Sequence, residues 1–269
     1  MGYNICVDGD SRFDVELGRR GNLYLVFDSK VQFLSRLDGV LFKYSKSWES
    51  IGDWYVHAAG LLVDERVNQF AWIVETGLLD VMDSGFDLKY SFTDWQKHGK
   101  NRCFVHNPEG FKFLISQFTV AYNLAPEYFC KKPVKLYAAF LVNHDKQSFD
   151  VNCRRFHNNN LAWYAGVLIG QVKKEGDWAL ELLYQVVQAR AMPDDDMAGI
   201  GRGNTLDDSF TSLTRRGNTN FHGFRLEGLY ALTDNITLDS LIEWTKAYEE
   251  DIGGKHTYSK FELEAIYAF

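Results

Sequence analysis

The last residues of the chain alternate strictly between apolar and charged side chains. One set of alternating positions holds Phe261, Leu263, Ala265, Tyr267 and Phe269, and the other holds Lys260, Glu262 and Glu264. Because successive strand side chains point to opposite faces, the pattern predicts a strand with one apolar and one charged face. An aromatic final residue and recurrence of the pattern along the chain are typical of the closing strand of a transmembrane β-barrel.

The same period of two recurs between polar or glycine-containing segments, and no segment follows a helical period. It predicts twelve strands: Arg12–Gly18, Leu37–Ser45, Trp54–Val63, Phe70–Leu79, Phe86–Thr93, Lys112–Leu124, Val134–Asn143, Leu161–Val172, Trp178–Ala189, His222–Leu232, Ile236–Thr245 and Ser259–Phe269. The expected fold is therefore all-β, an antiparallel transmembrane β-barrel that occupies residues 1–269 as a single domain.

Composition agrees with this fold class. The chain has 269 residues and a net charge of -7, and no run approaches the roughly 18 apolar residues of a membrane helix, which excludes a helical membrane protein. Aromatic residues make up 15% of the chain, as expected where aromatic girdles lie at both membrane interfaces. The acidic balance argues against nucleic acid as a partner.

The start of the chain and its cysteines leave alternatives open. Met1–Asp8 lacks the basic start and apolar core of a secretory signal, so either the chain is a mature or truncated form, which we favour, or the membrane interpretation is wrong. Cys6, Cys103, Cys130 and Cys153 form no CxxC pair, which argues against a metal site. Disulfide cross-links and unpaired thiols are both compatible with their spacing.

The predicted connections alternate in length. Residues 233–235 and 173–177 are short, whereas residues 145–160 and 190–221 are long and polar. Outer-membrane barrels place short turns on the periplasmic side and long loops outside, so the last strand is expected to run towards the periplasm. Tyr267 and Phe269 would then serve as an assembly signal at the periplasmic rim.

Residues 21–34 interrupt the alternation and are too apolar for an exposed loop. Two interpretations are open: a segment that folds inward and constricts a pore, or an extra strand followed by a turn. The basic residues around it are Arg19, Arg20, Lys30 and Arg36. At a constriction they would face an acidic wall and create a transverse field; the alternative, which we favour, is that they contact lipid headgroups.

The charged faces of the predicted strands would line the interior. The residues expected to line a pore are Glu75, Asp87, Lys89, Glu181, Arg225, Glu227, Asp239, Glu243, Glu262 and Glu264. A dry core could not hold so many charges, and a hydrated channel with an acidic majority would favour cations. The alternative is the solvated face of a soluble antiparallel sheet. Because we find no metal spacing, cofactor motif or nucleophile–base pair, we expect no enzyme and no cofactor.

Several stretches of the C-terminal part resemble the porin family of bacterial outer-membrane β-barrel channels. They include Glu175-Gly-Asp-Trp178, Gly217-Asn-Thr-Asn-Phe-His-Gly223 and Tyr230-Ala-Leu-Thr-Asp-Asn235. The resemblance implies a bacterial outer-membrane location, contact with membrane lipid and the outer-membrane assembly machinery, small polar solutes or ions as cargo, and a homo-oligomer. Family members carry further N-terminal strands, so the chain would be either a closed twelve-stranded barrel or the C-terminal part of a 16-stranded one.

Two other functions are compatible with the sequence. A non-conducting surface barrel, such as an adhesin or receptor, would act through the long loops at residues 145–160 and 190–221. A soluble lipocalin-like binder would fold in buffer without detergent.

Overall fold

The computed structural model describes residues 2–8, 10–34, 36–64, 69–95, 112–125, 131–145, 148–151, 154–193, 196–197, 200, 219–255 and 257–268. Thirteen of the described strands form one sheet in which each strand pairs with its neighbour in chain order, apart from the β9–β10 excursion. The strands are β1 (Gly2–Asp8), β2 (Ser11–Arg20), β3 (Leu37–Trp48), β4 (Gly52–Asp64), β5 (Gln69–Leu79), β6 (Phe86–Trp95), β7 (Phe113–Leu124), β8 (Val134–Asn143), β11 (Leu161–Gly170), β12 (Trp178–Val187), β13 (Phe221–Thr233), β14 (Ile236–Ala247) and β15 (Thr257–Tyr267).

All of the twelve strands predicted from the sequence are present, with ends that differ by a few residues. Strand β1 is additional, and so is a separate hairpin of β9 (Phe149–Val151) and β10 (Arg154–Phe156), which lies within the long polar loop expected at residues 145–160. Helical structure is limited to η1 (Leu23–Leu25), η3 (Val81–Asp83) and α1 (Glu250–Gly253) among the described residues. None of the described helices is long and apolar enough to cross a membrane.

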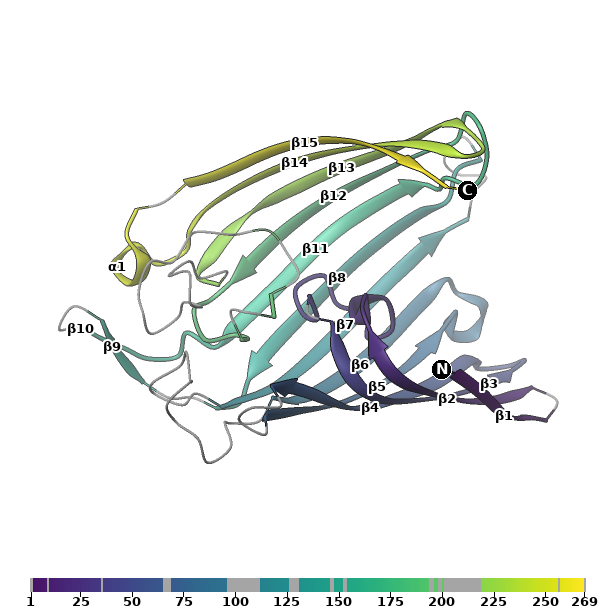
Figure 1. Ribbon diagram of the computed structural model, residues 1–269, viewed down its shortest axis with the longest axis horizontal. Helices are drawn as coiled ribbons and strands as arrows, with labels where there is room; N and C mark the ends of the chain where they lie inside the picture. The colour runs from purple at the N-terminus through teal and green to yellow at the C-terminus, as the bar shows by residue number, and fades with distance from the viewer. Residues whose placement is uncertain are drawn as a thin grey trace.

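The sheet curves strongly, so that it has a concave inner face and a convex outer face (Figure 1). Every neighbouring pair is antiparallel, from β1–β2 to β14–β15. Since direction alternates along thirteen strands, the edge strands β1 and β15 run in the same direction. The described residues contain no pairing between these two edges. A barrel that is antiparallel throughout needs an even number of strands, so closure of this sheet onto itself would require a parallel pairing.

The connections fall into two groups that lie at opposite ends of the strands (Figure 1). The turn end carries short connections, including residues 49–51, 80–85, 171–177 and 234–235. The loop end carries residues 21–36, 144–160, 188–220 and 248–256. Each strand of ten or more residues is long enough to cross the hydrocarbon core of a bilayer when tilted, which takes roughly 9–11 residues.

Strand β6 illustrates how the two faces differ. Phe86, Leu88, Tyr90 and Phe92 are exposed on the outer face, whereas Asp87, Ser91 and Thr93 are buried on the inner face. The same division follows from the register in the other strands, because residues paired directly across two strands lie on the same face. The sheet is therefore apolar outside and mixed polar and apolar inside, the reverse of a soluble protein.

Candidate functional site

The segment between β2 and β3, residues 21–36, folds into the concave side of the sheet (Figure 1). Four of its apolar side chains, Leu23, Phe27, Val31 and Phe33, are fully or almost fully buried. They join one hydrophobic cluster with inner-face residues such as Ile73 of β5. The inward position explains why these residues lack strand alternation: they pack on several sides at once.

Polar contacts attach this inward segment to strands β6, β7 and β12 of the wall. Ser29 Oγ donates to Gln117 Oε1 of β7 at 2.8 Å, and Gln117 Nε2 donates to the Asp28 carbonyl at 2.6 Å. Lys30 Nζ lies 2.7 Å from Glu181 Oε1 of β12, and Lys89 of β6 forms an ion pair with the Asp28 carboxylate. The segment is thus attached by backbone and side chain along its length rather than suspended in the interior.

The carboxyl group of Asp28 is held in its charged form. Burial alone raises its pKa, but the ion pair with Lys89 and the further positive charges of Lys135 and Lys30 outweigh burial and lower the pKa below the ordinary value of 3.8. A carboxyl whose pKa is lower in the folded state stabilises the fold above its ordinary pKa, and that contribution is lost as the pH falls through the folded value.

We therefore expect the attachment of the inward segment to hold from pH 7 to about pH 4 and to weaken below the ordinary pKa of an aspartate. Hydrogen exchange of the backbone amides near Asp28, measured by mass spectrometry across this range, would record the loosening. In the Asp28→Asn variant, the same backbone amides should exchange faster at neutral pH, and their exchange should change less on acidification. Equal pH dependence in the two proteins would contradict the assignment.

A second segment, after β12, packs onto the first from the loop end. Phe33 N donates to Asp196 Oδ2 at 3.0 Å, and Leu34 N donates to the Asp196 carbonyl at 3.2 Å. Met192 and Ile200 are buried in the same hydrophobic cluster. The loop-end half of the interior is therefore largely filled by apolar side chains. The sequence offers an inward position for residues 21–34 as one interpretation, but it predicts residues 190–221 as a surface loop, so the burial of Met192 and Ile200 is a correction.

All ten residues predicted to line a pore are inner-face positions according to the strand register. Their surroundings differ. Glu75 is only 1% exposed and accepts a hydrogen bond from Tyr55 Oη at 2.7 Å. Asp87 accepts hydrogen bonds from Asp80 N and Asn123 Nδ2, both at 3.0 Å, and so closes a turn. The sequence predicts that these two carboxylates are open to the interior. In the structure they are buried and engaged in internal hydrogen bonds instead.

The predicted basic cluster is divided between different places. Arg20 pairs with Glu16 on its own strand, and Arg19 lies 4.0 Å from Asp38 near the loop end of the outer face. Arg36 is exposed. Only Lys30 reaches across the interior to an acidic residue of the wall. The interpretation in which all four basic residues face an acidic wall does not match these positions.

Two tyrosines position inner-face carboxylates by covering glycines. A Cβ atom at Gly166 would collide with Tyr137, and one at Gly77 would collide with Tyr55. Tyr137 Oη donates to Glu181 Oε1 at 2.7 Å, the same oxygen that contacts Lys30. The absence of a side chain at Gly166 thus lets the tyrosine lie flat and orient Glu181.

Gly166→Ala is expected to lower the free energy of unfolding by about 1–3 kcal/mol, because the added methyl group forces Tyr137 away from Glu181. Chemical denaturation of the refolded protein would measure this. Gly228→Ala is the matched control: the nearest atom to its new Cβ would be the rotatable Ser240 hydroxyl at 3.0 Å. Similar losses in both variants would contradict this role of Tyr137.

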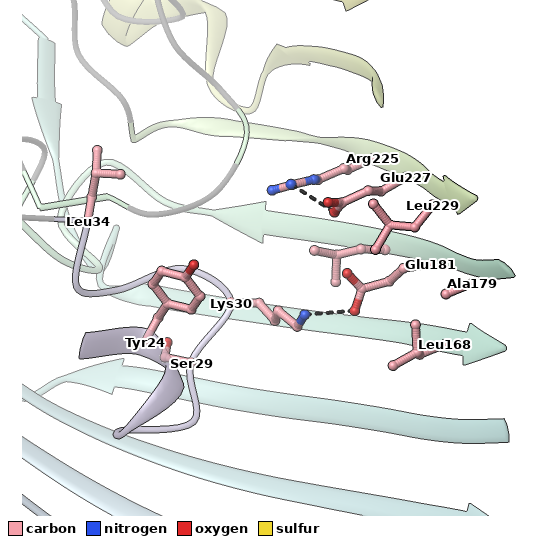
Figure 2. A pocket seen from close by; sticks show the side chains of 11 residues that line it. Tyr24, Ser29, Lys30, Leu34, Leu168, Ala179, Glu181, Arg225, Glu227 and Leu229 are labelled. Atoms are coloured by element: carbon pink, nitrogen blue, oxygen red, sulfur yellow. Dashed lines mark hydrogen bonds and ion pairs between the residues drawn. The ribbon is translucent and has the colours of Figure 1, made fainter. Parts of the chain in front are cut away.

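A cavity of about 420 Å³ lies between the inward segment and strands β11–β13. Figure 2 shows the side chains that surround this space. Among them, Lys30 is paired with Glu181, and Arg225 is paired with Glu227. The remaining lining is mostly apolar: Leu34, Leu168, Ala179, Leu183 and Leu229, with Tyr24 and Ser29 from the inward segment. In this cavity three of the predicted lining residues, Glu181, Arg225 and Glu227, meet open space.

The outer face carries a continuous apolar surface. Among its exposed side chains are Trp72 (54%), Leu182 (46%), Phe118 (51%) and Phe261 (71%). Aromatic pairs lie near both ends of the strands. At the turn end Trp48 stacks on Trp54, with ring centroids 5.8 Å apart, and Phe86 contacts Tyr122 at 4.6 Å.

The loop end has its own set of aromatic pairs. Trp163 contacts Tyr184 with centroids 5.6 Å apart, and Phe224 stacks on Trp244 at 5.8 Å. Lys246 lies over the Trp244 ring, 5.0 Å from its centroid. Two aromatic bands around an apolar belt are the surface expected of a transmembrane barrel, where such rings lie at the headgroup level.

A chain of polar groups on the outer face was missed in the sequence. Ser116 Oγ lies 2.9 Å from Tyr90 Oη and 2.8 Å from His144 Nε2. Sequence spacing gives no sign of it, because the three residues belong to β6, β7 and the segment after β8. Within the described ranges no carboxylate contacts His144. Tyr90, Ser116 and His144 form hydrogen bonds with one another on an otherwise apolar surface.

Some predicted residues lie outside the described part of the chain. Phe269, Cys103, Cys130 and Cys153 are among them, as is the side chain of Cys6. Tyr267 is described: it is 61% exposed and lies on the outer face at the turn end. The described side chains bring together no group of three or more histidine, cysteine or acidic residues that could hold a metal ion.

The curved antiparallel sheet, its apolar outer belt and its charged inner face define the class of protein: an all-β transmembrane β-barrel. No protein-family model matches the chain. No curated protein matches its sequence. One solved structure that is similar to it is the outer-membrane expressed OmpT of Vibrio cholerae; the chains are 10% identical, the alignment covers 97% of this chain and 77% of that chain, and the TM-score is 0.45. Membership of the porin family therefore stays a prediction.

Proposed function

We propose that this protein is a porin of a bacterial outer membrane, through which small polar solutes or ions diffuse passively. The contrast between the two faces of the sheet carries the proposal. Exposed Trp72, Leu182 and Phe261 on the outer face are costly in water and favourable in lipid. Charged Glu181, Arg225 and Glu227 on the inner face favour a hydrated interior.

The inward segment would narrow this passage. Lys30 of the inward segment and Glu181 of the wall both line the cavity shown in Figure 2 and form an ion pair there. Solutes would pass where these side chains and the Arg225–Glu227 pair are accessible. The acidic majority of the inner-face charges would favour cations over anions.

Liposome swelling tests the pore. Vesicles that contain the refolded protein should swell in an isosmotic solution of a small sugar such as arabinose, and should not swell in a solution of a large oligosaccharide. Vesicles that contain the inserted protein and remain impermeable to arabinose would contradict the proposal. Folding of the chain in buffer without detergent would favour the soluble binder.

A non-conducting surface barrel is the second candidate, and the filled loop-end half of the interior favours it. Phe27, Phe33, Met192 and Ile200 are all buried there. In that case the loop-end segments, including the β9–β10 hairpin, would bind a partner outside the cell. The swelling measurement separates the two functions, since a receptor barrel leaves vesicles impermeable.

A further inference from the structure

We propose that the interior cavity beside Lys30 binds small zwitterionic solutes with an apolar side chain, of which free apolar amino acids are the simplest. The inference rests on the proposed pore and names the class of solute that it selects. A volume of about 420 Å³ is within the range of small-molecule sites. The cavity lies against the wall formed by β11, β12 and β13.

The charges of the cavity form a neutral group of four. Glu181 and Glu227 are direct register partners on β12 and β13, so their carboxylates share the inner face as neighbours. Two like charges in that position repel each other unless they are compensated. Lys30 Nζ compensates Glu181 at 2.7 Å, and Arg225 Nη2 compensates Glu227 at 2.9 Å.

Each member of this group keeps part of its surface open. The side chains of Lys30 and Arg225 are 36% and 29% exposed, and those of Glu227 and Glu181 are 23% and 13% exposed. Nη2 of Arg225 donates to Glu227, and its Nε atom is buried. Because an arginine carries five N–H donors, the exposed part of the guanidinium group has donors left for a ligand carboxylate, and the two neighbouring carboxylates have acceptor positions left for an ammonium group.

Apolar side chains complete the site next to these charges. Leu183 is the register partner of Arg225, Leu168 is the register partner of Glu181, and Leu229 pairs with Ala179 one step further along the same face. All four line the cavity, together with Leu34 of the inward segment. An aliphatic side chain bound here would leave water and contact these leucines.

An apolar α-amino acid matches all three features. Its ammonium group suits the Glu181–Glu227 carboxylates, its carboxylate suits Arg225 and Lys30, and its side chain suits the leucines. A molecule with a single charge would add an uncompensated charge to this neutral group, which is unfavourable in a partly buried site. A neutral sugar can form hydrogen bonds to these charged groups through its hydroxyls, but it gains no contact between opposite charges.

Block of ionic current by small solutes tests the inference. In planar bilayers, L-leucine should reduce the current through the protein saturably. It should do so at a concentration at least about tenfold lower than 3-methylbutylamine or 4-methylpentanoate, which each lack one of its two charges. Equal block by the amine or by the acid would show a simple cation or anion site and would overturn the inference.

Two variants locate the site. Arg225→Gln and Glu227→Gln should each raise the half-blocking concentration of leucine about tenfold. Asp14→Asn, which removes a charge from β2 outside the cavity, should not. The inference would be overturned if leucine blocks both cavity variants as it blocks the wild-type protein. It would also be overturned if the wild-type protein conducts but leucine does not block its current. Neither result would contradict the proposed pore.

Calorimetry separates this inference from the pore itself. If the inserted protein carries no current, the proposed pore fails, and titration of leucine into the folded protein in detergent micelles decides the remaining question. Heat of binding that is lost in Arg225→Gln would support the site. No heat with the wild-type protein would overturn it.

Discussion

Leu182→Arg is expected to lower the free energy of unfolding in a lipid bilayer by about 2–4 kcal/mol. Leu182 lies in the middle of β12 on the outer face and is 46% exposed. An arginine at this depth would face the hydrocarbon core of the membrane, where a charged side chain is costly. Urea titrations of folding into vesicles of defined lipid composition would measure the loss.

Leu232→Arg is the matched control for this prediction. Leu232 is 45% exposed on the same apolar face, but it lies at the turn end of β13. Near the interface an arginine costs only about 0–1 kcal/mol. A soluble sheet would show no such dependence on position, so equal effects of the two substitutions would contradict the membrane position of the outer face.

Removal of the inward segment is expected to raise the conductance several-fold. Arg20 and Leu37 are direct register partners, so an Asn-Gly turn can join β2 to β3 in place of residues 21–36. The deletion removes Leu23, Phe27 and Phe33 from the hydrophobic cluster and releases Lys30 from Glu181. Less of the interior is then filled, and ions meet a wider passage.

A second deletion controls for the loss of chain length. The same Asn-Gly turn in place of residues 171–178, between the register partners Gly170 and Ala179, shortens a connection at the turn end, and it should leave the conductance unchanged. Conductance of the inward-segment deletion should be compared with that of this control in single-channel records. No increase in a folded, inserted protein would show that the inward segment does not limit the passage.

The alternation of apolar and polar residues was sufficient to predict most of the strands. In β6 and β13 the sequence alone separates the lipid-facing side chains from the interior ones, because each of these strands has one side that demands apolar residues. Strand β1 shows that the same signal can be overlooked, since Tyr3, Ile5 and Val7 alternate with polar residues and Cys6. The strands of the β9–β10 hairpin have three residues each, too few to define a period.

The candidate site was only partly accessible from the sequence. The inner-face positions of Glu181, Arg225 and Glu227 follow from periodicity. The contact between Lys30 and Glu181 joins residues 151 positions apart, and no local pattern specifies it. Burial also distinguishes residues that look alike in sequence: Glu75 is enclosed beside Tyr55, whereas Glu227 faces the cavity.

The filled loop end and the charged cavity suggest a passage that is selective rather than wide. Met192 and Ile200 are buried in the hydrophobic cluster of the interior, and the cavity beside β12 and β13 stays open. A pore of this kind would select solutes by contact with its wall. In a non-conducting barrel, the same cavity would be enclosed and would not be part of a passage.

Single-channel recording of the refolded protein in planar bilayers tests the central claim most directly. The proposed function predicts steady, ohmic conductance steps with a reversal potential that indicates a preference for cations. Insertion of a folded, heat-modifiable barrel without any conductance would contradict it and would favour the non-conducting surface barrel.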